Sequence, residues 1–382
     1  MRIAYVYDAL YPEVTGGAER RYFELGERLA ARGHDVHHVS WGFPRSSVSR
    51  HPRVRLHPVG RAPRLHDDRG MRTFREAAAF AIRSVPVLAR LDVDVIDCSS
   101  IPYASTFVAA ALRGRSHARL VVTWHEYMGE RWHAYLRHGA AVASRVEAAT
   151  ARRGNERVAV SAFTARRLPA GPPTRVVENG VDLARIRGAV PVAEPAGVVV
   201  AGRLVSHKRT DLVLEALARV PGATAVIIGD GAEGARLEAQ SRTLGLAGRV
   251  RFTGWLPRAE DLYSYLRGAK ALVSLSEQEG FGMTVIEAQT AGVVPIIARS
   301  EFSAAADLVE DGVTGLIVPP DPGAVAEALR RVLSDGRLRA AIRTNCFETT
   351  AQYDWGLIAD RMEGVYAEVP APVERQLVAA AA

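Results

Sequence analysis

The chain has 382 residues, of which 48% are hydrophobic and 24% charged, and its formal net charge is +7. This composition is typical of a soluble globular protein with about two domains of roughly 100–200 residues each. No apolar run approaches the roughly 20 residues of a bilayer span, which excludes a transmembrane helix. The chain contains only Cys98 and Cys346. We therefore expect no disulfide framework and predict a reducing, cytoplasmic setting.

The positive charge comes mostly from arginine, and arginines crowd one stretch of the first half. An excess of this sign suits an anionic ligand or an anionic membrane surface. A solvated surface is the simplest interpretation of the stretch, and a site for a phosphorylated acceptor or for lipid headgroups is the alternative. No nucleic-acid motif accompanies the charge, so we predict no nucleic-acid partner. The arginines are Arg45, Arg50, Arg53, Arg55, Arg61, Arg64, Arg69, Arg72 and Arg75.

The first half alternates strand-like and helix-like segments. RIAYVYD (2–8) predicts a first β-strand and not a signal peptide, because Asp8 interrupts a short apolar run. Helical spacing follows over residues 19–36 and stops at Gly33. VDVIDCS (93–99) and ARLVVTWH (118–125) are further strand-like runs. This order predicts a parallel sheet covered by helices on both sides.

The segment MRTFREAAAFAIRSVPVLARL (71–91) predicts a basic amphipathic helix. Packing on the sheet explains it most simply. A helix that lies on a membrane surface is the alternative, so we leave open a weak peripheral membrane contact.

The strand and helix alternation restarts near residue 197, after the Pro-, Gly- and Ala-rich segment RGAVPVAEPAG (187–197), which predicts a linker. The fold class is therefore α/β, with two doubly wound, Rossmann-like parallel-sheet domains that face a central cleft. Ligands of such sheets collect at the carboxyl ends of the strands. The strand-like runs of the second half are 197–204, 224–231, 250–255, 271–276 and 293–299.

Two cations follow the first strand of the second half, in AGRLVSHK. The Arg203 guanidinium can bind phosphate oxygens in a bidentate manner, and Lys208 adds a compact point charge. Two ordinary surface cations are the alternative. IIGDGAEG ends the next strand, and Gly231 there allows either a close approach of a nucleotide or a tight strand-to-helix turn.

The segment SEQEGFGMTVIEAQTAG predicts a strand-to-helix loop and then a helix that ends at Gly292. Amides at a helix start favour a diphosphate, and Gly282 lets the backbone crowd a ligand. Glu279 in the loop can accept hydrogen bonds from sugar hydroxyls. Glu287, about one turn into the helix, can reach a ribose diol. Exposed glutamates without a task are the alternative.

Two segments of the first half complete the candidate site. YPEVTGGAER places Gly16 and Gly17 at a helix start, where their amides can reach the distal phosphate across the cleft. A plain loop-to-helix turn is the alternative. TWHEY places His125 at the carboxyl end of a strand beside the cleft, where it can hydrogen-bond the sugar or stabilise charge at the reacting carbon.

Asp92 and Asp94 in LDVDVID look like a pair that holds a divalent metal. They fall in a strand pattern with period two in the first half, so strand-start aspartates explain them better. No His or Cys cluster has the spacing of metal ligands. We predict no metal and no cofactor.

Together these segments resemble the retaining family-4 glycosyltransferases of GT-B fold. The resemblance extends over residues 1 to about 366, in the family's order. The paired glutamates with Arg203 and Lys208 are its most specific part. The segments that carry it are GGAER, TWHEY, VENGVD, AGRLVSHK, GDG, FTGWLP and EGFGMTVIEAQTAGVVPI.

The resemblance implies an acceptor-binding domain over residues 1–187 and a domain for the nucleotide sugar over 188–352. It also implies that the helix at 353–369 crosses back onto the first domain, and we expect no structure in the tail at 370–382. The implied catalytic residues are His125, Arg203, Lys208 and Glu279. The implied donor-binding residues are Gly16, Gly17, Arg203, Lys208, Gly231, Trp255, Glu279, Phe281, Gly282, Met283, Thr284 and Glu287. Glu126 and Tyr127 are expected to bind the acceptor.

One segment departs from the family's pattern. After the strand at 293–299 the family usually carries a glycine pair and then an acidic residue. This chain has SEFSAAADLVEDG there, without that pair, and Asp307 is a candidate for the acid. The departure affects contacts near the donor sugar or the acceptor.

The resemblance implies transfer of a sugar from a nucleotide-diphosphate sugar to an acceptor hydroxyl with retention, by attack on the face that the diphosphate leaves. A nucleotide-sugar hydrolase or epimerase and a non-catalytic sugar-nucleotide sensor are the alternatives, because both would keep the donor site. The residues carry no code for the base, the sugar, the acceptor or the oligomeric state.

Overall fold

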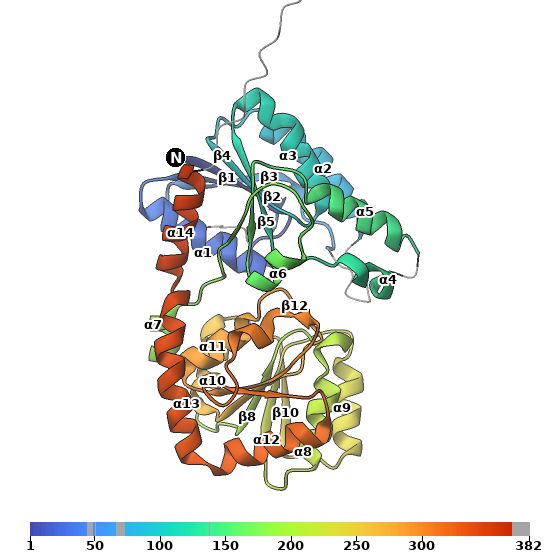
Figure 1. The fold of residues 1–382 in the computed structure, drawn as a ribbon, viewed down its shortest axis with the longest axis vertical. Helices are drawn as coiled ribbons and strands as arrows, with labels where there is room; N and C mark the ends of the chain where they lie inside the picture. Colours follow the sequence, from blue (N-terminus) through green and yellow to red (C-terminus); the bar gives the residue numbers. More distant parts are fainter. Residues whose placement is uncertain (44–48, 50, 66–72, 137, 369–382) are drawn as a thin grey trace, which may run out of the picture.

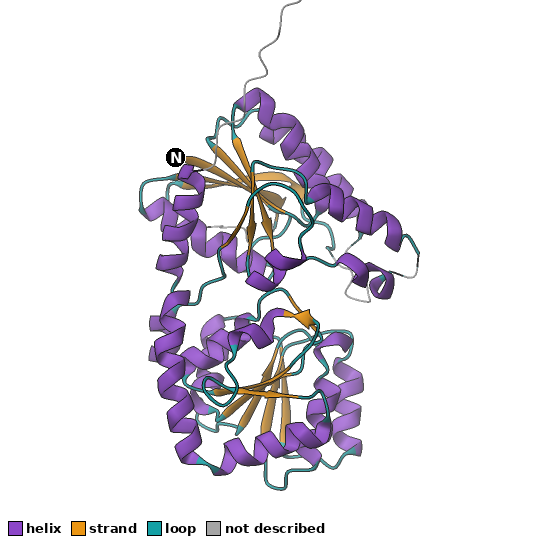
Figure 2. Ribbon diagram, in the orientation of Figure 1, coloured by secondary structure: helices purple, strands orange, loops and turns teal. Residues whose placement is uncertain are grey.

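The computed structural model describes residues 1–43, 49, 51–65, 73–136 and 138–368. These residues form two parallel β-sheets, one above the other in Figure 1, each with helices on both sides (Figure 2). The predicted α/β architecture is thus confirmed. The division at residues 187 and 188 stays a prediction, and the tail at 370–382 lies outside the described residues, as do Arg45, Arg50, Arg69 and Arg72.

The strands are short and mostly buried. They are β1 (Arg2–Val6), β2 (Asp35–Gly42), β3 (Val54–Arg61), β4 (Val95–Ser99), β5 (Arg119–Trp124), β6 (Glu156–Ala159), β7 (Thr174–Val176), β8 (Val198–Ala201), β9 (Ala225–Ile228), β10 (Val250–Gly254), β11 (Ala271–Ser274), β12 (Gln278–Glu279), β13 (Val294–Ala298), β14 (Phe302–Ser303) and β15 (Leu316–Val318).

Helices alternate with the strands along the chain. They are α1 (Gly17–Ala31), α2 (Phe74–Leu88), α3 (Tyr103–Ser116), α4 (Trp132–Tyr135), α5 (Ala140–Thr150), α6 (Ala162–Arg167), α7 (Leu183–Gly188), α8 (Thr210–Ala218), α9 (Gly234–Thr243), α10 (Ala259–Gly268), α11 (Met283–Ala291), α12 (Pro322–Ser334), α13 (Gly336–Thr349) and α14 (Trp355–Glu368), with 3-10 turns η1 (Gly129–Arg131), η2 (Ser206–Lys208), η3 (Ala304–Leu308) and η4 (Thr350–Tyr353).

The first sheet has the order β3-β2-β1-β4-β5-β6-β7, and all its pairings are parallel. β1 lies inside it, where Ile3 pairs with Val36 on one side and Val95 on the other. Helices cover both faces, which is why β1 reads as an almost continuous apolar run. The strand order reverses between β1 and β4, and the loop after β1 leads to Gly16 and Gly17.

The second sheet has the order β10-β9-β8-β11-β13-β15, also parallel. Its order reverses between β8 and β11. Arg203 follows β8, and Glu279 follows β11 in the short strand β12, which pairs with β14. The candidate residues therefore lie at the carboxyl ends of strands, beside a topological switch point, where doubly wound sheets bind ligands.

The last helix, α14, returns to the first sheet (Figure 1). Its residues Trp355, Ile358 and Met362 are buried in the same hydrophobic core as β1. At the crossing, the Val181 amide donates to the Tyr353 carbonyl, and a side chain at Gly180 would lie 2.6 Å from the Trp355 ring. VENGVD thus lies where the chain crosses between the two sheets.

Neither cysteine of the chain forms a disulfide, and both are buried. Among the described residues, no helix combines the length and the apolar character that crossing a bilayer requires. The predicted basic amphipathic helix is α2, which buries Phe80 and Leu88 and leaves Phe74 and Ile82 exposed.

Candidate functional site

The helix α11 starts at the cleft, at the end of the SEQEGFG loop. Gly282 has φ 112°, in the left-handed region that favours glycine, and it caps the start of the helix; Gly292 has φ 78° and ends it. Phe281 is buried at 4% exposure and packs against Tyr353. The sequence therefore fixes both ends of the helix whose amino terminus faces the first half.

The predicted cations lie beside the predicted acid. Lys208, at the end of η2, donates to Oε1 of Glu279, and the two form an ion pair. Arg203 is exposed and forms no ion pair with any described residue. Burial first, and then the charges of Lys208, Arg203 and Arg131, lower the pKa of His207 to about 4, although Glu279 opposes the shift. This region concentrates positive charge.

Glu287 is buried and lies against the first half. Nη1 of Arg20 donates to its Oε1 at 2.7 Å, and Nη2 of Arg20 donates to the hydroxyl of Tyr263. Burial raises the pKa of Glu287, and the Arg20 charge counteracts that shift. Within the described chain, Oε2 of Glu287 has no recorded hydrogen bond. Arg20 therefore holds one of the two carboxylate oxygens.

The amino ends of α1 and α11 meet across the cleft. A side chain at Gly17 would lie 3.5 Å from Cγ of Met283, so the two predicted residues are in contact. A side chain at Gly16 would lie 2.5 Å from the carboxylate of Glu19. Two helix starts that face each other sum their positive ends, which favours an anion between them.

His125 lies at the end of β5, with its ring near the rings of Tyr7 and Tyr22 at 6.4 and 6.0 Å between centroids. Both ring nitrogens are shielded from solvent and have no hydrogen-bond partner among the described residues. Burial, and secondarily the charge of Arg21, lower its pKa to about 3. The imidazole is therefore neutral and can donate one hydrogen bond and accept another.

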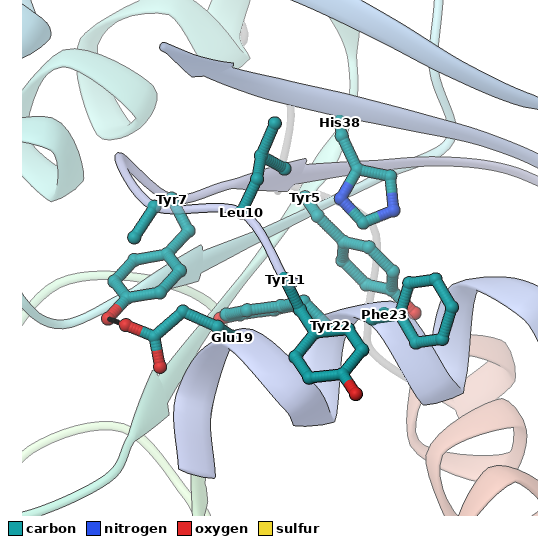
Figure 3. Close-up of a pocket in the computed structure, with 9 residues that line it drawn as sticks. Tyr5, Tyr7, Leu10, Tyr11, Glu19, Tyr22, Phe23 and His38 are labelled. Atoms are coloured by element: carbon teal, nitrogen blue, oxygen red, sulfur yellow. Dashed lines mark hydrogen bonds between the residues drawn. The ribbon is translucent and has the colours of Figure 1, made fainter. Parts of the chain in front are cut away.

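Beside His125, the loop after β1 and the start of α1 line a small pocket (Figure 3). The hydroxyl of Tyr7 donates to the Glu19 carboxylate at 3.0 Å. Aromatic rings form most of the wall, so the pocket holds Glu19 in a mainly apolar surrounding. The lining residues are Tyr5, Tyr7, Ala9, Leu10, Tyr11, Glu19, Tyr22, Phe23 and His38.

The glutamate loop is docked on the first half. The carbonyl of Gly280 accepts from the hydroxyl of Ser161 at 2.7 Å and from that of Thr164 at 3.3 Å. A Cβ at Gly280 would overlap the carbonyl oxygen of His125. Only a glycine permits this approach of the glutamate loop to the backbone at the end of β5.

A pocket beside this loop lies between the two halves. It includes both predicted acceptor residues, Glu126 and Tyr127, together with Glu279. Nε2 of Gln278 donates to Glu126 at 3.0 Å across the cleft. The other lining residues are Met128, Arg131, Phe163, Arg167, Gln278, Gly280 and Phe302.

The remaining predicted donor residues also belong to the second half. Gly231 has φ 158°, and a side chain there would overlap the backbone of Leu204, so packing within the second half already requires a glycine. Trp255 follows the edge strand β10 and is 50% exposed. Thr284 lies in the first turn of α11.

The aspartates considered for a metal are engaged otherwise. Arg2 forms ion pairs with both Asp92 and Asp94. Asp307, the candidate for the family's acid, pairs with Arg166 at 3.0 Å. In the described part of the chain no three His, Cys, Asp or Glu residues are grouped as a metal would need.

Sequence reasoning missed several contacts that cross the cleft. The contact of Arg20 could have been suspected from the sequence. A cation in the first turn of a helix is unfavourable beside the positive end of the helix dipole, so its presence suggests a specific acidic partner. Ser161 and Thr164 gave no such signal, since an N-cap serine followed by threonine is common at helix starts. Arg131 and Arg167 were hidden among the many other arginines.

Comparisons with known proteins match both halves of the chain. A family model described as "Glycosyltransferase Family 4" matches residues 15–185, and one described as "Glycosyl transferases group 1" matches residues 186–349. The chain is 30% identical over 203 residues to the lipopolysaccharide core biosynthesis glycosyltransferase LpsE of Rhizobium meliloti, covering 51% of this chain and 58% of that protein. It is 29% identical to the glycogen synthase of Mycobacterium tuberculosis, covering 96% and 94%.

Solved structures resemble the whole fold. Sucrose-phosphate synthase from Thermosynechococcus elongatus superposes with a TM-score of 0.82 at 24% identity, covering 96% of this chain and 98% of that one. Anabaena HepE in complex with UDP superposes with a TM-score of 0.77 at 22% identity, covering 96% and 100%. At these identities the likeness concerns the fold alone.

Proposed function

The chain belongs to the glycosyltransferases of GT-B fold, and we propose that it transfers a sugar from a nucleotide-diphosphate sugar to an acceptor hydroxyl, with retention and without a metal. One observation carries the proposal: the ion pair of Lys208 with Glu279 lies beside the start of α11, and Glu287 lies on the same helix. Cations, helix amides and two carboxylates thus meet at one cleft. The UDP and UDP-glucose bound in the HepE structures support a donor of this class.

The donor's diphosphate would bind Arg203, Lys208 and the amides at the start of α11. These groups neutralise the charge that develops on the leaving diphosphate, which is the protein's largest contribution to such a reaction. Glu287 would accept from the ribose through Oε2, and Glu279 from the transferred sugar. The neutral His125 would hydrogen-bond that sugar and supply no positive charge.

The transfer forms a bond between the acceptor oxygen and the anomeric carbon and breaks the bond from that carbon to the diphosphate oxygen. The acceptor attacks from the face that the diphosphate leaves, and a departing phosphate oxygen takes the hydroxyl proton. The hydrogen bond from Ser161 to the Gly280 carbonyl holds the glutamate loop against the first half. A closed cleft would exclude water that could otherwise hydrolyse the donor.

A panel of nucleotide sugars tests the proposal. We expect one member to raise the melting temperature and then to yield a glycosylated product with a retained anomeric configuration, read by NMR. Free sugar as the sole product would favour the hydrolase, and binding without any turnover across an acceptor panel would favour the sensor.

A weak membrane contact is a separate proposal about partners. The exposed side chains Phe74 and Ile82 project from α2 together with Arg75. An apolar stripe beside arginine suits an anionic membrane surface. Flotation with phosphatidylglycerol vesicles tests it, and we expect Ile82→Asp to reduce the bound fraction; equal flotation of both proteins would refute it.

A further inference from the structure

The pocket between the two halves contains two arginines that belong to the first half and reach over a residue of the second. Arg131 ends η1 and Arg167 ends α6. Their guanidinium carbons lie 4.6 and 4.9 Å from the ring centroid of Phe302. Both arginines line the same pocket as Glu279.

No described carboxylate neutralises these two cations. Arg131 donates only to the backbone carbonyl of Glu277, at 3.4 Å, and no ion pair of Arg167 is recorded within the described part of the chain. Two acids line the pocket, Glu126 and Glu279, and Glu279 is already paired with Lys208. Glu126, which accepts from Gln278, is then the one remaining carboxylate in the lining, against two arginines. Among the described lining residues the pocket therefore keeps a positive balance.

The contact with Phe302 orders the arginines without using up their donors. A guanidinium over an aromatic ring interacts through its face, and its N–H groups lie in its plane at the edge. Such an edge binds phosphate or carboxylate oxygens in pairs. Phe302 also lies in the segment SEFSAAADLVEDG, which lacks the glycine pair usual in the family that this chain resembles.

We propose that this pocket binds an anionic group, a phosphate or a carboxylate, that the acceptor carries, with Arg131 and Arg167 as its donors. The inference rests on the proposed function. Glu279 joins the pocket to the diphosphate site through Lys208, so a molecule in the pocket lies next to the transferred sugar. The remaining walls come mostly from the first half, which the resemblance assigns to the acceptor.

The test measures inorganic phosphate binding by ³¹P NMR with the donor site filled. UDP, GDP, ADP and dTDP are first titrated by calorimetry, and the tightest is kept at saturation so that phosphate cannot occupy the Arg203 and Lys208 region. We expect saturable phosphate binding that weakens at least tenfold in Arg131→Gln/Arg167→Gln. Arg131→Lys/Arg167→Lys, which keeps both charges, should retain most of it.

Arg153→Gln is the matched control, because Arg153 also lies over an aromatic ring, that of Phe107 at 5.1 Å, but does not line the pocket. Glucose 6-phosphate and glucuronate should bind the wild type more tightly than glucose. Tighter binding of glucose 6-phosphate would indicate a phosphate-bearing acceptor, and tighter binding of glucuronate would indicate a carboxylate-bearing one. The preference of the wild type for these anions over glucose should decrease as the salt concentration rises. This measurement does not depend on the folding of any variant.

The inference is overturned if phosphate binds the wild type and the Gln variant equally, or if glucose binds as tightly as its anionic derivatives. Failure of every nucleotide to bind would instead contradict the proposed donor site. The two failures are thus distinguishable.

Discussion

Arg20 of the first half donates to the carboxylate of Glu287 in the second half at 2.7 Å, and both side chains are buried. The pair joins the helix that starts at the glycine pair to the helix that starts at Gly282. A residue assigned to the donor's ribose is thus held in place by the opposite domain.

We predict that Arg20→Met weakens binding of the nucleoside diphosphate by at least about tenfold, because a buried carboxylate without its partner costs several kcal/mol. Burial raises the pKa of Glu287 and Arg20 opposes the shift. Without Arg20 the pKa rises further, so the carboxylate becomes protonated at a higher pH. As the pH is lowered from 8 to 5.5, calorimetry should show that the affinity for the nucleoside diphosphate begins to fall at a higher pH in the variant than in the wild type.

Arg32→Met serves as the control, since Arg32 also lies at α1 but pairs with Asp360 and Glu363 away from the cleft. Parallel pH profiles for the Arg20 variant and the wild type would show that Arg20 has no effect on the carboxylate.

Gly280→Ala should lower turnover about 100-fold while each half stays folded. The added methyl group would overlap the carbonyl of His125 and push the glutamate loop out of register, and a displacement of about 1 Å can cost that much. Steady-state kinetics with circular dichroism checks this. Gly364→Ala, in α14 with open space around it, should be harmless; equal activity of the two variants would contradict the docking of the loop.

His125 should not titrate in the working range of the enzyme. Its pKa is lowered to about 3, so the imidazole is neutral above about pH 4 and its protonation gives no step in activity between pH 5 and pH 8. ¹⁵N NMR of the ring nitrogens should show constant shifts across this range. A change of the ring shifts near neutral pH would show that His125 becomes protonated there, which would contradict a neutral imidazole.

Lys208→Ala should reduce kcat by about 100-fold, the typical effect of losing one group that stabilises charge in the transition state. Lys270→Ala is the matched control, because Lys270 is exposed and precedes β11 at the opposite end of the strand. Near-normal turnover of a folded Lys208 variant would show that Lys208 does not stabilise charge in the transition state.

Activity should be undiminished in excess chelator. The two aspartates with the most metal-like spacing, Asp92 and Asp94, are both paired with Arg2. Loss of activity that added Mg²⁺ or Mn²⁺ restores would revive the metal interpretation.

Local patterns predicted most of the fold. Apolar runs marked β1, β4, β5, β8, β9, β10, β11 and β13, because strands buried on both faces need such runs. β3 was not predicted, since it is an edge strand with the alternating, partly exposed sequence VRLHPVGR. β6 was not predicted because two of its four residues, Glu156 and Arg157, are charged and break an apolar run. β7 and β15 have only three residues each, too few to give a clear period.

The sequence marked single residues of the candidate site, but not the pairs that they form. Glycines and charges at strand ends marked Lys208, Glu279 and Glu287, because these positions follow from local sequence. The partner of Glu287 could not be predicted, since Arg20 is distant in sequence and meets it only when the two sheets face each other. The sequence showed that the segment around Phe302 lacks the family's glycine pair. It could not show the contacts of Phe302 with the two arginines, because these form only where the two halves meet.

A crystal structure with the tightest-binding nucleoside diphosphate tests the central claim most directly. We predict that the diphosphate lies within hydrogen-bond distance of Arg203, Lys208 and the first amides of α11, with the ribose on Glu287. A diphosphate bound elsewhere, with those side chains placed as they are here, would contradict the account.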